Sequence, residues 1–239
     1  MESAVGMRES PMRWRDYPRS SAPLPADDET LAKEALRCRY CWNDRRTGHL
    51  MAEGAYPIYS FGNPVGKRVI VIGLNPSLGE YTEGHLTRSE GWRRRRKEQL
   101  GYFARGRYKA YFRHLEDYFE GVGDLLGERV WEKIGYLDLV KCPISKDGST
   151  RWSMLEEQES EALIGSCEIF LKAQLKIYRP RLVIAHGRDV AKWLERNALP
   201  DGVNVYYVPQ SLRSERDPAA RAAKIKADIA VAVRTALAD

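Results

Sequence analysis

An amide side chain stands directly after a run that reads as a buried strand. Residues 69–73 are apolar and mostly β-branched, and the motif Gly73-Leu-Asn-Pro-Ser77 ends them. Such a run predicts a fully buried strand. Pro76 cannot donate to a ladder and Gly73 allows a sharp turn, so the strand must stop there. Because ligands of open α/β sheets bind at the carboxyl ends of strands, Asn75 is predicted to face a ligand.

Two acidic residues follow this motif closely. Glu80 and Glu83 are candidates for activating a water molecule, because a carboxylate can act as a general base. The alternative interpretation is an exposed polar loop.

The chain has four cysteines, Cys38, Cys41, Cys142 and Cys167. The first two are spaced so that both thiolates can reach one metal. Four thiolates can hold zinc or an iron–sulfur cluster, and spacing alone does not choose between them. Cys167 also lies on the apolar stripe of an expected helix, where a free buried cysteine is common.

Strands and helices alternate along the chain. Strands are expected at 69–73, 134–140, 182–185 and 203–208, and helices at 108–119, at 156–177 and from Pro218, with a long polar insertion at 81–107. The alternation predicts parallel βαβ units. We therefore expect an α/β fold with three α/β/α layers around a four-stranded, mainly parallel sheet. Residues 1–27 are predicted to form a flexible arm, and residues 28–239 a single domain.

Composition and charge indicate a nucleic-acid partner. The 239 residues carry a net charge of +6. A basic segment begins with Arg93, Arg94 and Arg95, and aromatic residues lie among the basic residues that follow. Basic side chains interleaved with aromatics suit a phosphate backbone and exposed bases, although a solvated helix face is the alternative. No apolar run reaches the length of a membrane span and no signal peptide is visible. A cytoplasmic, monomeric protein without a membrane partner is expected.

Four segments, in this order, resemble the uracil-DNA glycosylase superfamily over residues 36–237. Gly73-Leu-Asn-Pro-Ser77 is similar to its first motif, as in the mismatch-specific and thymine-DNA glycosylases. Asp138-Leu-Val-Lys-Cys-Pro143 resembles the strand with the base-reading residue. Residues 170–191 resemble its helix–Pro–strand–Gly unit, and Val208-Pro-Gln-Ser-Leu-Arg213 lies where the family has its His-Pro-Ser loop. The cysteine order resembles the iron–sulfur branch, which implies a [4Fe–4S] cluster rather than zinc.

The resemblance implies a monofunctional DNA glycosylase that flips its base out of the stack. Asn75 would position the attacking water, with Glu80 and Asp138 as further catalytic candidates. It also implies a wedge at Leu212 and a phosphate contact at Arg213. The implied base-binding residues are Gly73, Leu74, Pro76, Ser77, Phe112, Asp138, Gln210 and Ser211.

Two residues depart from the family pattern. The iron–sulfur branch usually has asparagine at position 138, whereas an ionised aspartate has no donor for uracil O4 but accepts from a cytosine amino group. Because removing ordinary cytosine would destroy the host genome, the expected substrate is a modified cytosine such as those of phage DNA, which implies a role in antiviral defence. Val208 replaces a histidine, so stabilisation of the leaving base would fall to backbone N–H groups, Gln210 or Ser211. His186 is interpreted as a satisfied histidine near the core.

Two alternatives remain open from the sequence. One is a uracil or hypoxanthine repair glycosylase in which Asp138 serves another purpose. The other is a cluster-bearing DNA-binding protein without catalysis.

Overall fold

The central sheet has four parallel strands in the order β2-β1-β3-β4. The computed structural model describes residues 27–52, 54–86, 91–106, 108–127, 129–144, 152–212 and 216–238. Nearly all of the predicted arm, and Arg213, lie outside these ranges. The strands are β1 (Val69–Gly73), β2 (Ile134–Asp138), β3 (Leu182–His186) and β4 (Asn204–Val208). The predicted α/β fold with a four-stranded sheet is thereby confirmed, and every strand pair is parallel.

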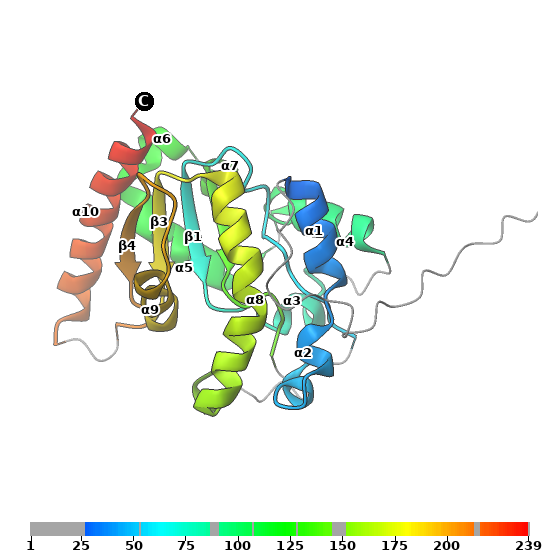
Figure 1. Cartoon of the computed structure of the whole chain (residues 1–239). Helices are drawn as coiled ribbons and strands as arrows, with labels where there is room; N and C mark the ends of the chain where they lie inside the picture. Colours follow the sequence, from blue (N-terminus) through cyan, green and yellow to red (C-terminus); the bar gives the residue numbers. More distant parts are fainter. Residues whose placement is uncertain are drawn as a thin grey trace, which may run out of the picture.

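Helices cover both faces of this sheet, giving three layers (Figure 1). The α-helices in the described residues are α1 (Asp28–Arg37), α2 (Tyr40–Asn43), α3 (Gly79–Thr82), α4 (Trp92–Leu100), α5 (Ala110–Glu116), α6 (Gly123–Leu126), α7 (Val130–Lys133), α8 (Glu157–Tyr178), α9 (Arg188–Arg196) and α10 (Pro218–Leu237). Short 3₁₀ helices are η2 (Gly48–Leu50), η3 (Phe103–Arg105), η4 (Asp117–Val122) and η5 (Trp152–Met154). None of the helices in the described ranges is long and apolar enough to span a membrane.

The strand alternation decides which helices meet which face. Ile70 and Val183 belong to the core under α8 and α9, whereas Val71 and Ile184 belong to the core shared with α5 and α10. All of β1, β2 and β3 is buried. Successive side chains of a strand point to opposite faces, so the residues that end these strands are assigned to a face by the same alternation.

The predicted polar insertion at 81–107 is more ordered than expected. It contains α4, and Tyr102 in it is 1% exposed. The helix predicted at 108–119 is divided into α5 and η4, and β2 ends at Asp138 rather than at residue 140. Tertiary packing buries residues of a segment whose composition is polar overall. Hydrophobic periodicity alone does not predict this burial.

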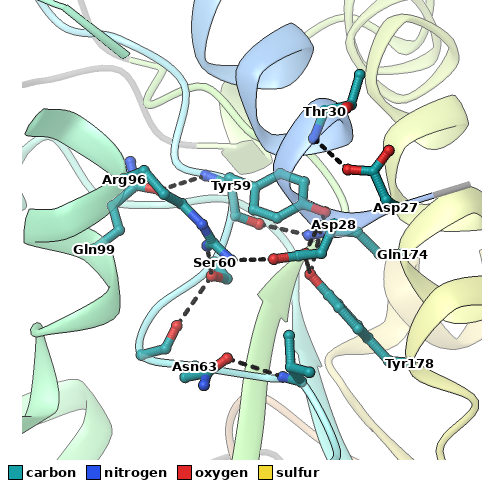
Figure 2. Close-up of polar contacts among 12 residues, drawn as sticks. Asp27, Asp28, Thr30, Tyr59, Ser60, Asn63, Arg96, Gln99, Gln174 and Tyr178 are labelled. Carbon is teal, nitrogen blue, oxygen red and sulfur yellow. Dashed lines mark hydrogen bonds and ion pairs between the residues drawn. The ribbon is translucent and has the colours of Figure 1, made fainter. Parts of the chain in front are cut away.

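A buried polar clasp holds α1 against the rest of the domain (Figure 2). The Asp28 carboxylate accepts hydrogen bonds from the hydroxyls of Tyr59 and Tyr178 and from the guanidinium of Arg96, the last at 2.7 Å. Arg96 also donates to Ser60 Oγ at 2.7 Å and lies over the Tyr59 ring. The clasp therefore joins α1, α4 and α8 through one carboxylate.

Candidate active site

The carboxyl ends of the strands bring several polar residues into one row. Gly73 pairs with Asp138 across β1 and β2, and His186 pairs with Val208 across β3 and β4. Ile72 pairs with Ala185, so Gly73 and His186 continue the same register. Asp138 and His186 thus flank the end of β1 on the face that α5 covers.

A cavity of about 280 Å³ opens at this row. This volume is near the lower limit of small-molecule sites and suits a ligand of nucleobase size. Ser77 and Gln210 line it and are exposed, so they mark its mouth. Its lining consists of Phe61, Leu74, Asn75, Pro76, Ser77, Glu80, Lys109, Tyr111, Phe112, Tyr136, Asp138, His186 and Gln210.

Asp138 is a buried carboxyl with incomplete hydrogen bonding. The Tyr136 hydroxyl donates to Oδ1 at 3.4 Å, while Oδ2 is buried with no partner among the described residues. Burial raises the pKa of Asp138 to about 7; Glu80 raises it further, whereas Lys141 and the Tyr136 hydrogen bond lower it. Lys141 is also buried, and its Nζ donates to the Asp138 carbonyl at 2.6 Å.

Gly73 makes room for this arrangement. A Cβ atom at position 73 would lie 1.8 Å from the Tyr136 hydroxyl oxygen and 2.8 Å from Asp138 Oδ1. Neither contact is possible for real atoms, so only glycine permits the hydroxyl to sit over the end of β1 and reach the carboxylate.

Glu80 is a second buried carboxyl in the cavity wall. It is 2% exposed and accepts a hydrogen bond from the Tyr102 hydroxyl. Burial raises the pKa of Glu80 to about 7, against the lowering effects of Tyr102, Lys109 and His85. The loop interpretation therefore fails for Glu80. It holds for Glu83, whose side chain is 54% exposed and pairs with Lys109 at 3.1 Å.

Asn75 lies half-buried in the wall of the same cavity. Its Nδ2 donates to the Pro76 carbonyl at 3.0 Å, and no described residue is bonded to its Oδ1. Lys109 lines the cavity nearby and its Nζ donates to Ser77 Oγ at 3.1 Å. An amide that can orient a water thus lies in one cavity with two carboxyls of raised pKa.

Phe112, which was predicted to bind the base, borders the cavity. It is 1% exposed and packs edge-on against Tyr136, with ring centroids 4.9 Å apart. Tyr102 lies behind the wall with its hydroxyl on Glu80, and Phe103 stacks on Trp131 instead.

Among the described residues, the arginines predicted to contact DNA lie on α4, whereas the predicted base-binding residue Ser211 and the predicted wedge Leu212 follow β4. Arg93 and Arg94 on α4 are exposed, with Arg94 3.7 Å from Glu98. Arg95 is half-buried: it donates to the Leu36 carbonyl at 3.2 Å and lies over the Tyr56 ring. Ser211 is exposed, and Leu212 is half-buried and packs against the main core. Neither Ser211 nor Leu212 borders the cavity.

Three cysteines form a buried cluster beside the sheet. The Sγ atoms of Cys41 (α2), Cys142 (after β2) and Cys167 (α8) all lie within 4.8 Å of one another. The Lys141 N–H donates to Cys167 Sγ at 3.4 Å. Hydrogen bonds from the other two thiols lower the pKa of Cys167 well below its usual value. Three such thiols fit the soft-ligand set of zinc or an iron–sulfur cluster. Cys38 is buried nearby but outside the cluster, and burial, together with the charge of Cys167, raises the pKa of Cys38 to about 12.

Five cavity residues escaped the sequence analysis as site residues: Phe61, Lys109, Tyr111, Tyr136 and His186. His186 was assigned to the core, and it is only 6% exposed, yet it also faces the cavity. Its place directly after a buried strand was the available signal. Tyr111 comes from α5, and no sequence pattern indicates which strand ends that helix covers.

This parallel α/β fold places an amide and two buried carboxyls around one cavity of nucleobase size at the carboxyl ends of the strands. Residues 59–230, well over half of the chain, match the family model described as the Uracil DNA glycosylase superfamily. The chain belongs to this superfamily and is therefore a DNA glycosylase that acts on DNA. No curated protein matches it.

Proposed function

We propose that this glycosylase releases a modified cytosine from DNA. The observation that carries the proposal is the buried Oδ2 of Asp138, an acceptor in the cavity wall without a donor among the described residues. A cytosine amino group can donate to this atom whether the carboxyl is ionised or protonated through Oδ1, whereas uracil O4 offers no hydrogen. A buried acceptor left unpaired penalises the wrong base strongly.

A specific observation favours uracil as the second candidate substrate. Burial raises the pKa of Asp138 to about 7, and a protonated carboxyl can donate to uracil O4. Uracil release would then be confined to acidic conditions, because the donor disappears as the pH rises through 7.

The restriction to a modified base follows from the consequence of the reaction. An enzyme that released plain cytosine would leave abasic sites throughout the DNA of its own cell. A cytosine substituted at carbon 5 and found only in phage DNA avoids this, so we propose a role in antiviral defence.

The residues of the cavity supply the steps of hydrolysis. Asn75 orients the attacking water through Oδ1, and Glu80, buried with a pKa raised to about 7, takes the proton of that water. Phe112 offers an aromatic face to the extruded base. Lys109 is held in an ion pair with Glu83 and is thereby kept from acting as an amine nucleophile. This supports a monofunctional enzyme without lyase activity.

The cysteine cluster is proposed to hold a [4Fe–4S] cluster, with zinc as the alternative. Cys41, Cys142 and Cys167 would supply three ligands and Cys38 the fourth after a local adjustment of the segment between α1 and α2. The group would serve a structural purpose, because it joins α2, the end of β2 and α8.

Abasic-site formation tests the proposed function. Purified enzyme is incubated with three matched duplexes carrying cytosine, 5-hydroxymethylcytosine or uracil, and with phage DNA containing modified cytosine, followed by alkaline cleavage. We expect release from modified cytosine only, and loss of it in Asn75→Ala with DNA binding retained. Release from uracil alone would refute the cytosine assignment, and strand cleavage without alkali would refute the monofunctional one.

A further inference from the structure

A chain of hydrogen bonds crosses the cavity wall and ends on the Asp138 carboxyl. His186 Nδ1 lies 2.7 Å from the Tyr111 hydroxyl, which lies 2.9 Å from the Tyr136 hydroxyl. Tyr136 in turn donates to Asp138 Oδ1 at 3.4 Å. All four residues line the cavity, although they come from β3, α5 and β2. The chain therefore connects the two groups that flank the end of β1.

Each member of this chain has one hydrogen to give, so the hydrogen bonds run in one direction at a time. When Asp138 is ionised, His186 Nδ1–H donates to Tyr111, Tyr111 to Tyr136, and Tyr136 to the carboxylate. When Asp138 is protonated, the order reverses, Tyr111 donates to Nδ1, and the hydrogen of His186 lies on Nε2. The protonation of Asp138 thus selects the tautomer of His186.

Nε2 is the atom that remains for the substrate. No described residue is bonded to Nε2, and His186 borders the cavity. Burial lowers the pKa of His186 to about 4, so its ring is neutral at pH 7. Its strand neighbour Val208 offers no hydrogen bond through its side chain. In the reversed order of the chain, the cavity therefore contains one imidazole N–H donor opposite Asp138.

We propose that His186 donates a proton from Nε2 to the departing base, and that Tyr111 and Tyr136 resupply this proton from Asp138. This inference rests on the proposed function and assigns its leaving-group acid. A cytosine whose amino group meets Asp138 presents its O2 edge toward the opposite side of the cavity, where His186 lies across β1.

The proton transfers of this step balance. The bond between the sugar C1′ and base N1 breaks, and its electron pair leaves with the base. The base takes the Nε2 proton, Nδ1 takes one from Tyr111, Tyr111 takes one from Tyr136, and Tyr136 takes the one on Asp138. Water adds to C1′ and its proton passes to Glu80. Solvent then returns one proton to Nε2, and the Nδ1 proton passes back through Tyr111 and Tyr136 to Asp138. Glu80 releases its proton to solvent.

The surroundings of both ends fit these assignments. Asp138 faces Tyr136, Lys141 and Glu80, and burial together with Glu80 outweighs Lys141 to leave its pKa near 7. His186 faces the Tyr111 hydroxyl, and burial alone accounts for its lowered pKa. A neutral histidine that receives a replacement proton from a carboxyl of raised pKa can act as a general acid near neutral pH.

Two variants and a matched control test this relay. Tyr111→Phe breaks the chain and keeps the ring, His186→Phe removes the donor, and Tyr108→Phe removes a hydroxyl bonded to Glu116 outside the cavity. Single-turnover base release is measured from pH 5.5 to 9. We expect Tyr111→Phe and His186→Phe to release the base about a hundredfold more slowly than wild type. Their rates should no longer fall above pH 7. Tyr108→Phe should match wild type in both respects. A substrate base with an electron-withdrawing substituent, which leaves without a proton, should recover most of the loss.

Nitrogen-15 NMR of the imidazole gives a readout independent of activity. In the wild-type chain, the hydrogen of His186 should move from Nδ1 to Nε2 as the pH falls through 7, and in Tyr111→Phe it should not. The proposed proton transfer would be refuted if the His186 tautomer of the wild-type chain did not change with pH, or if the variants were active with unchanged pH profiles. Neither result would affect the proposed glycosylase function. A wild-type enzyme that releases no base, with the tautomer switch present, would instead refute the proposed function alone.

Discussion

Asp138 combines two properties that rarely occur in the same carboxyl group: its side chain is buried, and one of its oxygens has no hydrogen-bond partner among the described residues. Burial disfavours its charged form and raises its pKa to about 7. The open Oδ2 gives it the capacity to read a donor on a ligand. Such a group lowers stability when it ionises, so its presence in a cavity is more readily explained by binding than by folding.

The free energy of unfolding should depend on pH because of Asp138. The folded chain keeps the Asp138 proton up to about pH 7, whereas the unfolded chain releases it near 3.8. Its contribution to stability therefore falls as the pH rises through this window and is lost above it. Asp138→Asn should gain about 3 kcal/mol more at pH 8 than at pH 5, relative to wild type, by urea unfolding. The exposed Asp201→Asn serves as control, and an equal effect of Asp138→Asn at both pH values would contradict the buried carboxyl.

Gly73→Ala tests the packing of the Tyr136 hydroxyl. The new Cβ would lie 1.8 Å from that oxygen, so Tyr136 must move and the hydrogen bond to Asp138 must break. Base release should fall about a hundredfold, measured by abasic-site formation with folding checked by circular dichroism. Gly165→Ala on α8, where a Cβ meets nothing within 4 Å, should leave the rate unchanged. Wild-type activity in Gly73→Ala would argue against this geometry.

At the scale of elements, the parallel sheet gathers the site and the helices close it. Parallel strands place their carboxyl ends at one edge, so Asn75, Asp138 and His186 meet there although they are distant in the chain. Helix α5 then adds Tyr111 and Phe112 over the same face. Elsewhere in the domain, the Asp28 clasp adds polar contacts that join α1 to α4 and α8 (Figure 2).

Removal of the clasp should loosen α1. Asp28→Ala leaves the Arg96 guanidinium, 9% exposed, without its carboxylate. Because an unpaired buried charge is costly, we expect the free energy of unfolding to fall by about 3 kcal/mol in urea denaturation. Glu132→Ala removes a carboxylate paired at 2.8 Å with Arg129 on the surface and should change stability little. Similar effects of the two variants would show that the clasp adds no more than a surface pair.

At the scale of the whole molecule, the cysteine cluster connects α2 to the segment after β2 and to α8. Its three thiols come from segments far apart in the chain, and all are buried. A bound metal or cluster would therefore stabilise the folded arrangement as a whole.

Cysteine substitution tests this connection. In Cys142→Ser we expect bound iron or zinc per chain to fall to background, visible absorbance to disappear if the group is iron–sulfur, and amide exchange to rise in α2 and the centre of α8. Cys38→Ser separates a four-cysteine set from a three-cysteine set, because metal content falls only if Cys38 is a ligand. Retention of metal in Cys142→Ser would exclude the buried cluster as its site.

The charge of α4 predicts how DNA binding responds to salt. Arg93 and Arg94 are exposed, whereas Arg95 is engaged with Leu36 and Tyr56. The logarithm of the DNA-binding constant falls linearly with the logarithm of the salt concentration, and each arginine that binds a phosphate adds about 1 to the steepness of this fall. Removing such an arginine makes the slope shallower by that amount. Arg93→Ala and Arg94→Ala should each lower the slope in fluorescence-anisotropy titrations. Arg95→Ala should leave it unchanged, and a lower slope there would place that guanidinium on DNA.

The parallel α/β fold was predictable from the order of residues alone, because buried β-branched runs alternate with amphipathic helices. The local pattern also placed Asn75 directly after a strand, whereas Asp138 was singled out by the family resemblance and was expected inside a strand that ran to residue 140. Three features depend on how distant segments pack together: the burial of Glu80, the inward position of Arg95, and the hydrogen bond between Tyr111 and His186. Those contacts join segments up to 75 residues apart, and burial depends on which helix packs over which strand end. No local pattern of residues encodes that choice.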